Sequence, residues 1–190
     1  MTCLETIYYI LIGVLLALLW ELVNVYNRLV KYRNAADANM GQIKVALKKR
    51  LDMVEQLLGA VKGYVKHERE IFESIARLRA GVGDAGASGL NDIDKKSREI
   101  VNNLLAVAEA YPDLKASENV TKLMEAIVGV EDEIARHRYT YNNVVQEFNT
   151  MIDVFPSNFV AGAMKATKLG YLEFEEAIQK PPDVSVNPDG

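Results

Sequence analysis

The sequence predicts an all-α protein in which an N-terminal transmembrane helix continues into a long antiparallel helical bundle or coiled coil with a short fourth helix. Residues 6–20 are uncharged and largely apolar. Beyond them, apolar residues recur at steps of three and four over long stretches, which is the period of an α-helix. Glycine and proline are sparse and clustered, a composition typical of long helices and not of a sandwich or barrel.

The apolar run is predicted to be an uncleaved membrane anchor over residues 1–25. Its fifteen residues form a helix of about 22 Å, and Leu22, Val23 and Val25 extend it past Glu21 toward the roughly 30 Å of a hydrocarbon core. A cleaved signal peptide is the alternative interpretation. It is disfavoured because residues 1–6 contain no Lys or Arg and no small-residue cleavage site precedes the helix.

Basic residues follow the apolar run instead of preceding it. Arg28, Lys31 and Arg33 come shortly after it, whereas Glu5 and the α-amino group precede it. The positive-inside rule therefore predicts a single-pass protein of the cell membrane whose soluble domain lies in the cytoplasm. We expect the three basic side chains to contact membrane lipids at an anionic surface; a solvated helix face without a partner is the alternative.

The formal charge changes sign along the chain. Residues 28–50 carry seven Lys and Arg against one acid, whereas residues 51–190 carry 15 basic and 23 acidic residues, within a total of −4. The acidic remainder and the membrane tether argue against nucleic acid as a partner.

The first soluble helix is predicted over residues 25–79, as a stalk that continues the membrane helix. An apolar stripe runs along it and no proline interrupts it, so that its 55 residues would span about 80 Å. Within it, Gly59 and Gly63 indicate either close packing of two helices or tolerated glycines. Four glycines in residues 80–89 then predict a flexible hairpin connection.

Two further helices and a tail complete the predicted fold. The second helix covers about residues 91–111 and ends at Pro112, and the third runs to Pro156 with five heptads of apolar residues. A short fourth helix passes through residues 161–164. We expect one helical domain over residues 26–178 and a disordered, proline-containing tail over residues 179–190.

Three aromatic residues toward the end of the third helix lie seven positions apart. Tyr141, Phe148 and Phe155 are therefore predicted to form one buried row. Asn142 and Asn149 lie beside that row, where they either set the helix register through buried hydrogen bonds or face solvent. Because the second helix is much shorter than the third, part of the apolar stripe on the third helix is left without a partner. Either the fourth helix or a second copy of the chain must pack against it, and we expect a homo-oligomer.

Catalytic and metal motifs are not recognisable in the sequence. Cys3 is the only cysteine, so an intramolecular disulfide is excluded. His67 precedes Glu68, but Ile71 stands where a zinc-protease motif needs its second histidine. His137 lies on another helix, so that surface or inter-helix positions are expected for both. No catalytic residue, cofactor or metal site is predicted.

Several stretches, in a fixed order from about residue 26 to 173, match a known family. They include residues 26–30, 61–64, 107–116 and 155–158, together with Arg50, Glu131 and Arg138. In these stretches the chain resembles the LemA family, prokaryotic membrane proteins with a helical soluble domain. The resemblance implies an anchored helical protein without an established catalytic role and, as a partner, a membrane protease.

These observations predict a non-catalytic, membrane-anchored helical scaffold or adaptor that displays a rigid surface to protein partners. The alternative from a different class is a metal- or histidine-dependent hydrolase, or its accessory protein, acting at the membrane through His67 and His137.

Overall fold

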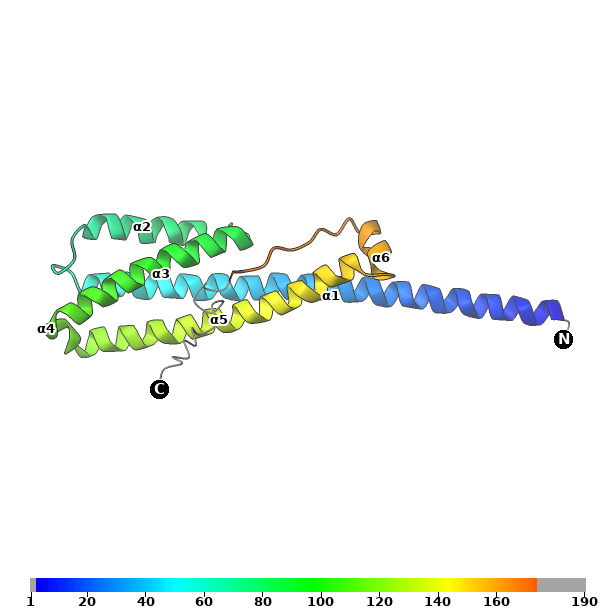
Figure 1. The fold of residues 1–190 in the computed structure, drawn as a ribbon, viewed down its shortest axis with the longest axis horizontal. Helices are drawn as coiled ribbons and strands as arrows, with labels where there is room; N and C mark the ends of the chain where they lie inside the picture. Colours follow the sequence, from blue (N-terminus) through cyan, green and yellow to red (C-terminus); the bar gives the residue numbers. More distant parts are fainter. Residues whose placement is uncertain (1–2, 174–190) are drawn as a thin grey trace, which may run out of the picture.

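The computed structural model describes residues 3–173, and this part of the chain contains six helices and no strand (Figure 1). The all-α prediction is confirmed. The predicted tail over residues 179–190 lies outside the described residues. The helices are α1 (Cys3–Ala60), α2 (Glu68–Gly81), α3 (Ala87–Ala110), α4 (Pro112–Lys115), α5 (Glu118–Asp153) and α6 (Ser157–Ala163).

Helix α1 is one continuous helix of 58 residues that joins the apolar run to the bundle. It is the one helix in residues 3–173 that is long and apolar enough to cross a membrane, with a mean hydropathy of 2.0 in a window of which no residue is buried. Side chains from Ile7 to Val23 are exposed on all sides, and burial begins at Val25. The membrane-length part and the core-forming part of α1 therefore follow each other without a break.

The predicted stalk to residue 79 is wrong in its length, because α1 ends at Ala60 and the chain reverses (Figure 1). Gly63 has φ 92° and His67 has φ 63°, both in the left-handed region that ends a right-handed helix. Nothing lies within 4 Å of a Cβ built at Gly59 or Gly63, so these glycines make no close helix contact. Gly63 lies in the turn that lets α2 run back along α1, whereas Gly59 lies in the last turn of α1 itself.

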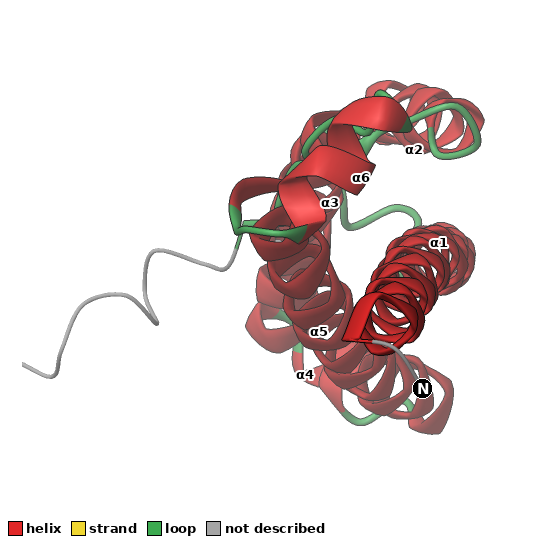
Figure 2. Cartoon of the chain, turned by 90° about the vertical axis from the view of Figure 1, so that its right-hand side faces the viewer, coloured by secondary structure: helices red, strands yellow, loops and turns green. Residues whose placement is uncertain are grey.

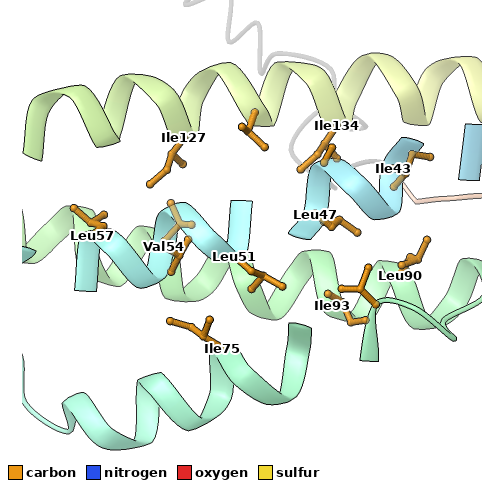
Figure 3. Packing of buried hydrophobic residues seen from close by; sticks show 14 of the residues in the cluster. Ile43, Leu47, Leu51, Val54, Leu57, Ile75, Leu90, Ile93, Ile127 and Ile134 are labelled. Carbon is orange, nitrogen blue, oxygen red and sulfur yellow. The ribbon is translucent and has the colours of Figure 1, made fainter. Parts of the chain in front are cut away.

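The core lies between α1, α5 and the α2–α3 pair. Figure 3 shows Ile127 and Ile134 of α5 facing α1 from one side, and Ile75 of α2 and Ile93 of α3 lying on the other. Full burial of an aliphatic side chain contributes about 1.5–3 kcal/mol, so this central stripe of α1 supplies much of the driving force. Its fully or nearly fully buried members include Ile43, Leu47, Leu51, Val54 and Leu57.

The predicted aromatic row is wrong at one of its three positions. Tyr141 and Phe148 are buried, but the Phe155 side chain is 78% exposed. Helix α5 ends at Asp153, and beyond a helix end a spacing of seven no longer keeps side chains on one face.

A second, smaller core forms where α6 meets α1 and α5. It contains Val25 and Leu29 of α1, Phe148 and Met151 of α5, and Ala161 of α6. The end of the α5 stripe is thus covered within one chain, as the first of the two expected solutions required. The stripe therefore gives no reason to add a second copy.

Candidate functional site

The basic residues of α1 divide into two groups with different surroundings. Arg28, Lys31 and Arg33 are exposed close to the apolar end of α1, and their contact with lipid stays a prediction. Lys44 instead donates from Nζ to the Gly83 carbonyl at 2.7 Å. Lys44 stands 23 residues beyond Glu21, or about 35 Å along the helix. Electrostatic attraction between exposed charges is screened over about 8 Å at physiological salt, so Lys44 is too far from the apolar segment to feel a lipid surface there. Only the first group lies close to the apolar segment of α1.

Arg50 of α1 is the centre of a buried ionic cluster. Its side chain has no exposed surface, and its guanidinium reaches Asp94 Oδ1 at 2.9 Å and Glu131 Oε1 at 2.7 Å. It also donates to the Asp94 carbonyl at 3.0 Å and to the Ser97 hydroxyl. One side chain of α1 is therefore bonded to both α3 and α5. We define the ionic cluster as Arg50, Asp94, Ser97, Arg98, Glu131 and Arg138.

Asp94 of α3 receives three guanidinium groups. Its carboxyl oxygens lie 2.9 Å from Arg50, 2.6 Å from Arg138 and 3.1 Å from Arg98. Burial by itself raises the pKa of the Asp94 carboxyl, but the positive charges of Arg50, Arg138 and Arg98 outweigh burial and hold that pKa below its ordinary value. Asp94 is therefore a buried carboxylate whose negative charge is compensated by arginines in direct contact with it.

This arrangement suits mechanical linkage better than catalysis. Arginine does not release its proton in proteins, and a carboxylate held ionised by three cations is a poor proton acceptor and a poor proton donor. The cluster instead joins α1, α3 and α5 at one level of the bundle. Its signal in the sequence was the presence of Arg50 and Arg138 in or beside apolar stripes, since a charge on a buried face needs a partner of opposite sign.

The segment after α6 forms a C-terminal strap, which we define as residues 165–173. It runs in extended form back along α5 (Figure 1). Asn149 donates to the Leu169 carbonyl and accepts from the Leu169 amide, both at 2.9 Å. Asn142 makes the same pair of bonds with Leu172, at 2.7 and 2.9 Å. The two asparagines thus hydrogen-bond to the strap and not to another helix, and they fix its register.

The far end of the strap meets the ionic cluster. The Tyr141 hydroxyl donates to the Gly170 carbonyl at 3.0 Å, and Arg138 Nη1 donates to the Glu173 carbonyl at 2.9 Å. Burial, aided by the negative charge of Asp37, raises the pKa of the Tyr141 phenol and keeps it a donor. Arg138 therefore ties the strap to Asp94 and so to α3.

The structure keeps the two histidines apart in separate elements. His67 lies in the turn before α2 beside Glu70, with 3.4 Å between Nδ1 and Oε1, and His137 lies on α5 beside Glu133 at 4.0 Å. Within residues 3–173, no group of three His, Cys, Asp or Glu side chains is arranged to hold a metal ion.

An open groove of about 700 Å³ runs between α2 and α3. Apolar side chains from both helices, including Ile71, Leu78 and Ile100, line it together with charged residues such as Arg77 and Lys96. An apolar floor with a charged rim is the composition of surfaces that bind other proteins.

A membrane-length apolar helix that runs directly into a closed helical bundle defines a membrane-associated, all-helical protein. The profile of the LemA family matches residues 39–186, well over half of the sequence, and the chain belongs to the LemA family. The resemblance found in the sequence is thereby confirmed.

Known proteins similar to this chain include members of two named groups. Protein LemA of Metamycoplasma hominis is 28% identical over 137 residues, which cover 71% of this chain and 63% of the relative. Magnetosome protein MamQ of Magnetospirillum gryphiswaldense is 23% identical over 174 residues, covering 77% and 64%. Magnetosome protein MamQ 1 of Paramagnetospirillum magneticum is 28% identical over 113 residues, covering 60% and 41%. The chain thus spans less than two thirds of the length of these relatives.

Proposed function

We propose that this protein is a non-catalytic scaffold or adaptor, anchored in the cell membrane by α1, with its bundle in the cytoplasm. The observation that carries the proposal is the continuity of α1 from Cys3 to Ala60. Because one helix is both the membrane-length segment and the centre of the core, the bundle is held at a fixed distance from the membrane. A surface held in this way is suited to receiving another membrane protein.

The groove between α2 and α3 is the surface we assign to that partner. It lies in the half of the bundle away from the apolar end of α1 (Figure 1). A partner that reaches it must extend well above the bilayer, as the soluble domain of a membrane protease does. The presence of both Arg77 and Lys96 with Glu70 and Asp92 on its rim favours a partner with charges of both signs.

Photocrosslinking in native membranes tests the proposal. A photoreactive amino acid replacing Ser74, which lines the groove, should form a discrete protein adduct. Arg77→Glu on the rim should reduce that adduct, whereas Arg136→Glu on the exposed face of α5 should leave it unchanged. An adduct that survives Arg77→Glu, or the absence of any adduct from the anchored and folded protein, would contradict the groove as the partner surface.

The hydrolase alternative is separated from the scaffold by the histidines. His67 and His137 lie on different elements and each faces a glutamate of its own segment, so no shared site supports hydrolysis. A double variant, His67→Ala with His137→Ala, should still form the Ser74 adduct. Loss of the adduct with the fold intact would reopen the alternative.

A further inference from the structure

Three apolar side chains at the turn between α5 and α6 are exposed, although the helices beside them are packed. Val154 is 46% exposed, Phe155 78% and Phe159 68%, and the two phenylalanine rings meet edge to face with 5.9 Å between their centres. A contiguous exposed apolar patch, unlike scattered single residues, is typical of a contact surface. We call Val154, Phe155 and Phe159 the α5–α6 corner.

The α5–α6 corner lies at the membrane end of the bundle. Helix α6 packs on α1 at Val25 and Leu29, which are four and eight residues beyond Glu21, or about 6 and 12 Å along the helix axis. In Figure 1 the turn between α5 and α6 is the part of the bundle nearest the apolar end of α1. Figure 2, seen from that end, shows α6 in front of the other bundle helices.

The depth of the bilayer brings this corner to its surface. A hydrocarbon core of about 30 Å takes roughly 20 helical residues, and twenty residues counted from Thr6 end at Val25, where the exposed stretch of α1 gives way to the bundle. The headgroup layer extends a further 5–7 Å or so on each side. Because α6 packs on α1 at Val25 and Leu29, the exposed side chains of the α5–α6 corner lie at the level of that layer.

The charges around the corner match an anionic lipid surface. Lys165 and Lys168 follow α6, and Lys168 pairs with Asp153 at 2.8 Å. Arg28 and Lys31 are exposed on α1 nearby, although the chain as a whole carries −4. Basic side chains flanking exposed aromatic ones are the composition of segments that lie in a membrane interface.

We propose that the α5–α6 corner is a second membrane contact, in which Phe155 and Phe159 insert into the interface of the bilayer that α1 spans. The inference rests on the proposed anchoring by α1 and adds a point of contact beside the helix axis. A single helix leaves the bundle free to tilt and rotate on the membrane. A second contact off the axis sets one orientation and so decides which face of the bundle points away from the lipid.

Fluorescent labels on the full-length protein in vesicles of phosphatidylglycerol and phosphatidylcholine test the proposal. In a Cys3→Ser background, single cysteines replace Phe155 or Phe159 and carry an environment-sensitive dye. We expect emission shifted to the blue, and quenching by lipids with a nitroxide on the headgroup. The aqueous control is Tyr139→Cys, which is 63% exposed on α5 and lies 16 residues before Phe155.

A fourth label separates this proposal from the anchoring on which it rests. Leu16→Cys reports on the apolar run and should be quenched by nitroxides deep in the acyl chains. If Leu16 behaves in this way while the labels at positions 155 and 159 match the aqueous control, the corner is not a membrane contact and the anchor stands. If the Leu16 label is itself aqueous, the anchoring fails and the proposal with it.

A second copy of the chain is the competing occupant of the corner. Oxidative crosslinking of the Phe155→Cys protein distinguishes it from lipid. The disulfide-linked dimer should fall in yield as added lipid dilutes the protein, because the side chain at position 155 faces lipid and not a second copy. A yield that stays constant over a hundredfold dilution would overturn the proposal in favour of a dimer contact.

Discussion

Arg50 on α1 and Asp94 on α3 form an ion pair across 2.9 Å in a place where the Arg50 side chain has no exposed surface. Desolvating both charges is costly, and the structure offsets this by adding Glu131, Ser97 and Arg138 around them. Removing one charged side chain of the ionic cluster therefore leaves a buried charge of opposite sign without its partner.

Replacing Arg50 should therefore be one of the most destabilising changes outside the apolar core. Arg50→Met leaves buried carboxylate oxygens without their main cation and should cost about 3–5 kcal/mol. Lys49→Met is the matched control, because Lys49 pairs with Glu133 at 3.1 Å on the surface and should cost less than about 1 kcal/mol. Urea unfolding of the full-length protein in micelles, followed by circular dichroism, measures both. Equal costs would contradict the role assigned to Arg50.

The carboxylate of Asp94 should make stability depend on pH. Its pKa in the folded state lies below the ordinary aspartate value of about 3.9, so it stabilises the fold above that value and this contribution is lost as the pH falls through the folded pKa. Asp94→Asn should thus be less stable than the parent at pH 7, by a margin that narrows only below about pH 4. The exposed Asp92→Asn is the control. A margin independent of pH down to pH 2.5 or so would count against the charge as its cause.

The strap should loosen when its clamps are removed. Asn149→Ala deletes two hydrogen bonds and leaves the backbone of Leu169 unsatisfied, at a cost of about 1–3 kcal/mol. The amide of Leu169 should then exchange with solvent deuterium much faster, while amides in the middle of α5 keep their protection. Asn143→Ala changes an exposed asparagine of the same helix and should leave the exchange of Leu169 unaltered.

The two phenylalanines seven residues apart should respond in opposite ways to truncation. Phe148→Ala opens a cavity between α1, α5 and α6 and should cost about 3–5 kcal/mol. Phe155→Ala, at 78% exposure, should change the unfolding free energy in micelles by less than about 0.5 kcal/mol. Thermal unfolding of both variants decides the matter. A similar loss for both would place Phe155 in the core after all.

The orientation of α1 in the membrane is also open to a direct measurement. Because Arg28, Lys31 and Arg33 follow the apolar run, a reporter fused at the C-terminus should be active only in the cytoplasm. Protease added to intact cells should leave the bundle uncut. Digestion of the bundle from outside would reverse the predicted orientation.

The sequence predicted best those elements whose ends are marked by local chemistry. The second and third predicted helices end close to the ends of α3 and α5 because Pro112 and Pro156 follow them, and a proline acts on the backbone wherever the fold places it. The end of α1 was missed because no proline marks it. The reversal of the chain after α1 uses left-handed conformations at Gly63 and His67. Because a histidine adopts that conformation only occasionally, its presence in the sequence does not predict a turn.

The contacts of the ionic cluster and of the strap could not be predicted from the sequence for a different reason. Arg50 is one of seven basic residues in residues 28–50, and its place between Leu47 and Val54 on the apolar stripe of α1 indicates burial but does not identify its partners. Those partners, Asp94 and Glu131, are 44 and 81 residues away along the chain. Asn142 and Asn149 stand at heptad spacing in the sequence, but their partner is the extended backbone of the strap, and an extended backbone without alternating apolar residues leaves no periodic pattern in a sequence.

The pairing of α1 with α5 also bears on the order in which the chain is made. Helix α1 leaves the ribosome first, yet α5, which packs along it, begins only at Glu118. In the interval Leu47 and Leu51 have no α5 to cover them, although the apolar end of α1 is already available for insertion. Such long-range contacts form slowly, and exposed apolar surface invites aggregation. With the proposed anchor, we expect insertion of α1 into the membrane to hold nascent chains apart until α5 has been synthesised.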